Sequence, residues 1–72
     1  MGYNEKQLII LEKQIRGKMH AIKNKLVTPK DSGIGILMNK MKLVDEPMYE
    51  SLLKEYVEIY KNFNKENLDN NK

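Results

Sequence analysis

His20 is the only histidine in this 72-residue sequence, and Ser32 and Ser51 are its only serines. A catalytic histidine needs a nucleophile or a second metal ligand beside it, and neither serine stands in a nucleophile-elbow pattern such as GxSxG. The chain has no cysteine and therefore no thiolate nucleophile or thiolate metal site. Its carboxylates also lack metal-loop spacing. These observations predict a protein that is not an enzyme and binds no metal or cofactor.

A short glycine-containing segment, Ser32-Gly33-Ile34-Gly35, does not have the pattern of a phosphate loop. A phosphate loop needs GxxxxGK[ST], and a dinucleotide fingerprint needs GxGxxG after a strand. Only GxG is present here, and no strand pattern precedes it. We interpret the segment as a flexible connection or a place of close helix packing, with a hinge that reorganises on binding as the alternative.

The first predicted helix carries basic side chains opposite its apolar face. They are Lys6, Lys13, Arg16, His20 and Lys23. Two interpretations stay open, namely a solvated face, or a contact with nucleic acid or with an acidic protein. A nucleic-acid site would have a single arginine to read guanine edges and no interleaved aromatic ring to stack on bases. Nucleic acid would therefore bind weakly and in a strongly salt-dependent way.

Apolar residues accompany this basic face. Ile9 projects into it and Ile10 flanks it, which favours a dimer or partner surface. On the last predicted helix, three tyrosines share one face and either pack in the core or form a recognition surface. The candidate partner-binding residues are Ile9, Ile10, Lys13, Arg16, His20, Lys23, Tyr49, Tyr56 and Tyr60.

The pattern predicts a first helix at about residues 5–25. Asn4 can cap it, with Gln7 at capping-box spacing, and Tyr3 and Leu8 occupy the two hydrophobic-staple positions. Apolar residues then recur at spacings of three and four, which makes a narrow apolar stripe. They are Leu8, Leu11, Ile15, Met19, Ile22 and Leu26.

A second start signal, Thr28 followed by Pro29, predicts a short middle helix or loop at about residues 29–41. Gly33 and Gly35 argue against a helix because each lowers helix stability. The apolar residues of this segment need cover in either case. They are Ile34, Ile36, Leu37, Met38 and Met41.

The third start signal is the strongest, because Asp45 can cap a helix that has Glu46 and Pro47 in its first turn. A broad apolar face follows and predicts a helix at about residues 46–63. The remaining residues, 64–72, are rich in Asn, Lys, Glu and Asp and are expected to form a disordered tail.

Together these elements predict an all-α antiparallel helical hairpin of the two long helices, forming a single small domain over residues 1–63. A two-helix core is thin for an independent fold, so we expect a homodimer or a chain completed by a partner.

The net charge is +3, and the charged residues are distributed unevenly along the chain. Residues 1–43 hold nine basic and three acidic residues, whereas residues 44–72 hold four basic and seven acidic residues. No secretory signal pattern and no apolar run of about 18 residues are present, so we expect a cytoplasmic protein with no membrane partner.

The sequence therefore predicts a small non-enzymatic protein-binding regulator or inhibitor, of bacterial or phage type, that docks a helical face on a larger protein. The alternative is a nucleic-acid-binding helical hairpin dimer that uses the basic face of the first helix.

Overall fold

The structure is a computed structural model that describes residues 4–70, with side chains described for residues 4–65. Every regular element in this part of the chain is a helix, which confirms the all-α prediction. Its helices are α1 (Glu5–Lys23), α2 (Pro29–Ser32), α3 (Ile34–Val44) and α4 (Glu46–Asn70).

The start of α1 is the predicted capping box. The Asn4 side chain accepts a hydrogen bond from the Gln7 backbone N–H at 2.9 Å, and the Gln7 side chain accepts one from the Asn4 N–H at 3.3 Å. Tyr3, which was expected to complete the hydrophobic staple, lies outside the described residues.

The end of α1 comes at Lys23 rather than near residue 25. Lys25 adopts a left-handed φ of 63°, and its N–H and that of Leu26 turn back to bond the Ile22 and Ala21 carbonyls. This paired closure is the Schellman pattern of a helix end. Leu26 therefore lies in the exposed loop and not on the buried stripe where the sequence placed it.

The predicted middle helix is divided into α2 and α3 at Gly33. Gly33 has a left-handed φ of 76°, which costs a residue with a side chain more than it costs glycine. The Ser32 hydroxyl donates a hydrogen bond to the Pro29 carbonyl at 2.8 Å and accepts one from the Ile34 N–H at 3.1 Å. The second bond gives the first N–H of α3 an acceptor. α3 then continues to Val44, past the predicted end at residue 41.

Asp45 caps α4 as predicted, since its Oδ1 accepts a hydrogen bond from the Met48 N–H at 3.1 Å. The helix continues to Asn70 instead of ending near residue 63. No glycine or proline follows Pro47, so the sequence holds no strong helix breaker after that residue. The disordered tail expected over 64–72 stays a prediction for the protein in solution.

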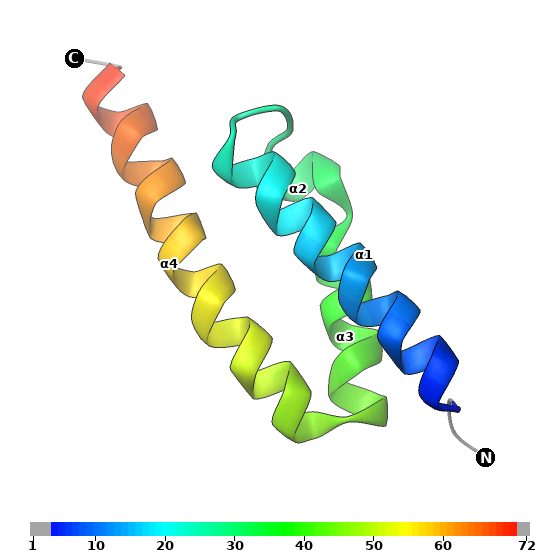
Figure 1. Ribbon diagram of the computed structural model, residues 1–72. Helices are drawn as coiled ribbons and strands as arrows, with labels where there is room; N and C mark the ends of the chain where they lie inside the picture. Colours follow the sequence, from blue (N-terminus) through cyan, green and yellow to red (C-terminus); the bar gives the residue numbers. More distant parts are fainter. Residues whose placement is uncertain (1–3, 71–72) are drawn as a thin grey trace.

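The helices run up, down and up in Figure 1, so that α3 is antiparallel to both of its neighbours. Antiparallel hairpins therefore exist, but they pair α1 with α3 and α3 with α4. The two long helices, predicted to be antiparallel, run in the same direction: Arg16 contacts Glu55, and further along both helices Ile22 and Phe63 line one hollow. The cause is that the middle segment is itself a helix that crosses the molecule, which adds a second reversal of the chain.

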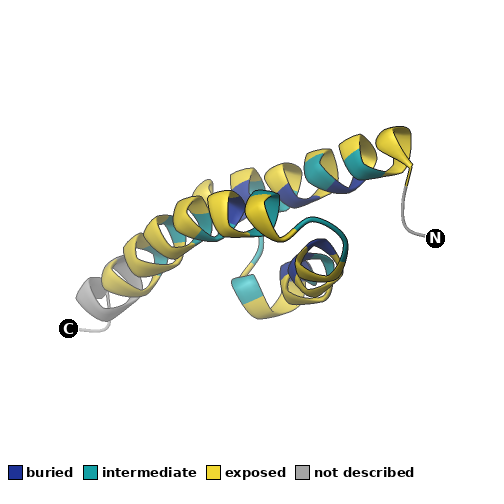
Figure 2. Cartoon of the chain, turned by 90° about the horizontal axis from the view of Figure 1, so that it is seen from below, coloured by how far each residue is buried: buried dark blue, intermediate teal, exposed yellow. Residues whose placement is uncertain are grey.

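The core lies where α1, α3 and α4 meet, and Figure 2 colours the buried positions along these helices. Four of the predicted stripe residues of α1 are buried with three residues of α3 and one of α4. The buried apolar residues are Leu11, Ile15, Met19, Ile22, Ile34, Met38, Met41 and Leu52. Ile36, which was expected to need cover, remains exposed. Among the described residues, every helix is too short or too polar to cross a lipid bilayer.

Candidate interaction surface

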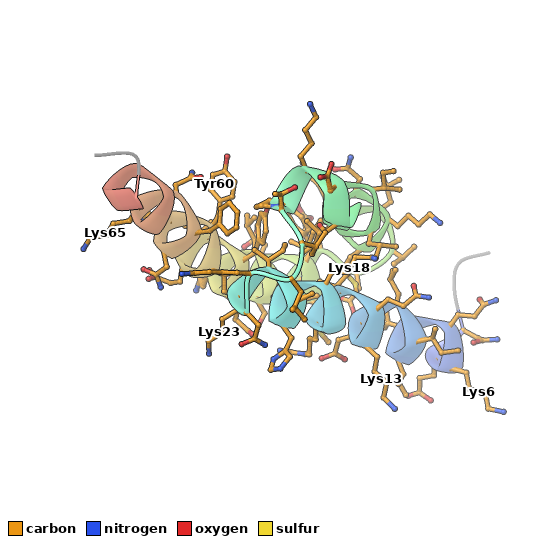
Figure 3. All side chains as sticks on the ribbon, turned by 90° about the horizontal axis from the view of Figure 1, so that it is seen from above. Lys6, Lys13, Lys18, Lys23, Tyr60 and Lys65 are labelled. Carbon is orange, nitrogen blue, oxygen red and sulfur yellow. The ribbon has the colours of Figure 1, made fainter. Side chains whose placement is uncertain are left out.

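The outer face of α1 presents part of the predicted basic surface to solvent. Ile9, Lys13 and His20 are all exposed. Figure 3 shows Lys6, Lys13 and Lys23 on the side of α1 that faces away from α3. The predicted basic residues are therefore brought together, apart from Arg16.

Arg16 is engaged in ion pairs within the chain. Its Nε donates to Oε2 of Glu12 at 2.9 Å, and its Nη1 donates to Oε1 and Oε2 of Glu55 at 2.9 and 3.1 Å. These hydrogen bonds, the one to Glu12 first, raise the pKa of the guanidinium. The single arginine of the chain thus links α1 to α4 and is not available to read a base edge without losing those bonds.

Two of the three candidate tyrosines lie together. The rings of Tyr56 and Tyr60 have centroids 5.8 Å apart at a tilt of 41°, and Tyr60 is 44% exposed. Burial, and then the charge of Tyr60, raise the pKa of the Tyr56 hydroxyl. Both rings line a hollow of about 370 Å³ between α4 and the start of α3. Tyr49 is half-buried elsewhere, with the Lys42 ammonium 5.8 Å from its ring centre.

A larger hollow, of about 760 Å³, lies between α1 and α3. Gly17 forms part of its floor, and a Cβ built on Gly17 would meet no atom within 4 Å. The space above this residue is therefore open. The lining residues are Gln14, Gly17, Lys18, Ala21, Val27, Asp31, Ser32, Gly33, Ile36 and Leu37.

A smaller hollow of about 350 Å³ continues it along the same pair of helices, since Gln14 lines both. Its other lining residues are Gln7, Ile10, Leu11 and Lys40. We call the two hollows together the α1–α3 groove. Of the predicted partner-binding residues, Ile10 belongs to this groove and is 55% exposed.

Two apolar residues of α3 are strongly exposed, and Ile36 is one of the residues that line the groove. Ile36 and Leu43 are 68% and 86% exposed. Their spacing of seven residues places them on one side of the helix, opposite the buried Met41. Sequence reasoning missed this surface because it expected Ile36 to be covered and did not single out Leu43. The seven-residue spacing on the side away from the buried residues was the available signal.

The groove also carries charge that the sequence reasoning did not single out. Lys18 lines the larger hollow and Lys40 the smaller one, and Figure 3 shows Lys18 on the opposite side of α1 from Lys13. No ion pair within the described residues engages either lysine. Asp31 is the one acidic residue that lines the groove. Its lining is therefore apolar with a basic margin.

His20 lies exposed on the outer face of α1. The described residues contain no group of three or more His, Cys, Asp or Glu side chains placed to hold a metal ion. No family model, curated protein or solved structure matches this chain. The interaction surface has to be interpreted from its own chemistry.

Proposed function

We propose that this chain is a small non-enzymatic binding protein that docks the α1–α3 groove on a larger protein and thereby regulates or inhibits it. The observation that carries the proposal is that Ile10 and Ile36 are more than half exposed in the lining of one groove, and that Leu43 is exposed on the same side of α3 as Ile36. Single exposed apolar residues are ordinary on a protein surface, whereas a contiguous group beside a groove is typical of an interaction site.

Burial gives the proposal its energetic basis. Full burial of one isoleucine or leucine side chain contributes about 1.5–3 kcal/mol. Three such side chains, together with the half-buried Leu37, therefore give a partner enough apolar surface to offset part of the entropy lost on association. A docked partner would occupy this face of the molecule and compete with any other ligand of the same partner surface.

Nucleic-acid binding by the outer face of α1 is the alternative function. Lys6 and Lys13 are free to contact phosphates, but the ion pairs of Arg16 bring Glu12 and Glu55 close to that face. Carboxylates repel a phosphate backbone, so the local charge supports this alternative less than the sequence alone does.

Homodimerisation was expected because two helices enclose a thin core. α3 adds a third wall to the core within one chain, and three of its residues are fully covered there, namely Ile34, Met38 and Met41. Self-association therefore no longer follows from an incomplete core, and it would have to use exposed residues such as those of the groove. Sedimentation equilibrium of the purified chain measures it directly.

The experiment that tests the proposed function places a photo-crosslinking amino acid at position 36, beside the groove. The matched control carries it at Lys54, which is exposed on α4. Both variants are irradiated in the cells that produce the protein, and the extract is treated with nuclease. We expect a discrete protein adduct from position 36 and none from position 54.

The same adduct from both positions, or no protein adduct from position 36, would contradict the proposal. An adduct that disappears with nuclease would move the function to nucleic acid. An adduct with the mass of two copies of the chain would identify the groove as a dimer contact.

A further inference from the structure

We infer that the α1–α3 groove receives an amphipathic helix with acidic flanks, contributed by a partner protein. This inference rests on the proposed function and specifies the partner segment. It is carried by the shape of the groove, by its small floor residues and by the charge at its margins.

The shape fits a helix. The groove follows α1 from Gln7 to Ala21, which is about 21 Å at 1.5 Å per residue. α4 already packs against α1 and α3 (Figure 1), and none of the described residues of α4 lines the groove, so the groove is a second place where a helix can pack on this pair. A helix of about 14 residues spans that length and packs against two helices at once.

The floor of the groove lets a partner approach closely. Gly17 and Ala21 are four residues apart, so they lie on one side of α1, and both line the larger hollow. The open space above Gly17 can take a large apolar side chain of the incoming helix. Ile36 lines the same hollow and Ile10 the adjoining one, so both can cover apolar side chains of the incoming helix. A small floor between exposed isoleucines is complementary to the apolar stripe of a helix.

The basic side chains at the margin of the groove favour a helix with acidic flanks. Lys18 and Lys40 lie at the two hollows with no carboxylate partner among the described residues, and Asp31 is the one opposing charge. A helix with glutamate or aspartate beside its apolar stripe satisfies both ammonium groups. The net charge of +3 also favours encounter with an acidic segment.

Charge disfavours one other occupant of the groove, and shape disfavours another. A second copy docked face to face brings Lys18 and Lys40 toward the same lysines of its partner. An anionic membrane would attract the lysines, but a flat bilayer surface leaves the recess above Gly17 unfilled. We therefore assign the groove to a helix, and treat self-association and vesicle binding as outcomes that decide against it.

The test uses two stapled 14-residue helical peptides with the same leucine and alanine stripe. One carries glutamate and the other lysine on both flanks. Binding to the full chain is followed by fluorescence anisotropy of labelled peptide and by amide chemical shifts of the ¹⁵N-labelled protein. At about 50 mM salt we expect the glutamate peptide to bind about tenfold more tightly than the lysine peptide. Its shifts should map to residues 14–21 and 36–40.

A charge-swap variant sharpens the test. Lys18→Glu combined with Lys40→Glu should reverse the preference, so that the lysine peptide binds more tightly. The matched control, Lys54→Glu combined with Lys61→Glu, changes the same number of charges on exposed positions of α4 and should retain the glutamate preference. Circular dichroism of each variant verifies that the helices are intact.

Equal affinities of the two peptides, shifts that map away from the groove, or a preference that survives the charge swap would overturn the inference. The inference would also be overturned if the amide shifts of the groove residues respond to self-association of the chain, or to vesicles of anionic phospholipid, and not to the peptide. The crosslink at position 36 tests the proposed function separately from the inference about an acidic helix. A protein adduct without peptide selectivity leaves the proposed function standing, whereas the absence of both removes the function and the inference together.

Discussion

Arg16 of α1 donates two hydrogen bonds from one nitrogen to the carboxylate of Glu55 on α4, at 2.9 and 3.1 Å. The two residues are 39 positions apart in the chain, so this pair links the two long helices, which run in the same direction. Both side chains are close to half exposed, which limits the free energy that the pair contributes.

We expect Glu55→Gln to lower the free energy of unfolding by less than about 1 kcal/mol, because solvent screens an exposed pair. Urea denaturation at low and high salt measures the effect, which should shrink as salt screens the wild-type pair. Glu50→Gln is the control, because Glu50 is exposed on the same helix and takes part in no ion pair among the described residues. A loss of several kcal/mol would mean that the pair is buried in solution.

Two isoleucines of α3 should respond in opposite ways to truncation. Ile34 is 1% exposed, so Ile34→Ala should cost about 2–5 kcal/mol, enough to unfold much of so small a domain. Ile36→Ala should change stability by less than about 0.5 kcal/mol and weaken partner binding instead. Thermal denaturation by circular dichroism compares the two variants. Similar losses at both positions would show that Ile36 is covered in the free protein.

Substitution of two glycines by alanine should change stability in opposite directions, because their backbone conformations differ. Gly33→Ala should destabilise the fold by about 1–2 kcal/mol, because alanine disfavours the left-handed φ of 76°. Gly17→Ala should stabilise it by about 0.5–1 kcal/mol, because Gly17 is helical and its Cβ meets no atom within 4 Å. Urea midpoints of the two variants should therefore move in opposite directions, and a shift in the same direction would contradict the break at Gly33.

Stability should fall at alkaline pH through Tyr56. Burial raises the pKa of its hydroxyl above the ordinary value of 10.0, so the unfolded chain loses this proton at a lower pH than the folded chain does. The contribution is constant below about pH 10 and is lost as the pH rises through the folded pKa. Tyr56→Phe should flatten that part of the profile of unfolding free energy against pH. Tyr60→Phe removes only the smaller cause of the shift and should leave part of the slope. A Tyr56→Phe profile identical to wild type would contradict this account.

Local signals in the sequence predicted the local structure well. Asn4, Thr28 and Asp45 each cap a helix where the spacing indicated, because a cap depends on three or four consecutive residues. The direction of α1 against α4 was not predictable in the same way. An apolar stripe shows which side of a helix is buried but not which helix covers it, and the prediction built the core from the two long helices with the middle segment in need of cover.

In the candidate site, too, the sequence predicted local features but not the contacts between distant residues. Ile10 was singled out because an isoleucine on a polar face has no local explanation, and the structure places it beside the groove. Arg16 was grouped with free basic residues because the sequence cannot show that Glu55 lies next to it. Ile36 was expected to need cover with the other apolar residues of its segment, whereas folded proteins leave many single apolar side chains exposed.

The parallel arrangement of α1 and α4 has a consequence for the order of folding. α1 with α3, and α3 with α4, are neighbours in the chain and close short loops, whereas the contact of Arg16 with Glu55 closes a loop of 39 residues. We expect the two hairpins to form early and the side between α1 and α4 to close last. The contact between α1 and α4 is then where the native molecule opens first. Such an opening releases α4 and leaves α1 packed on α3, with the α1–α3 groove intact.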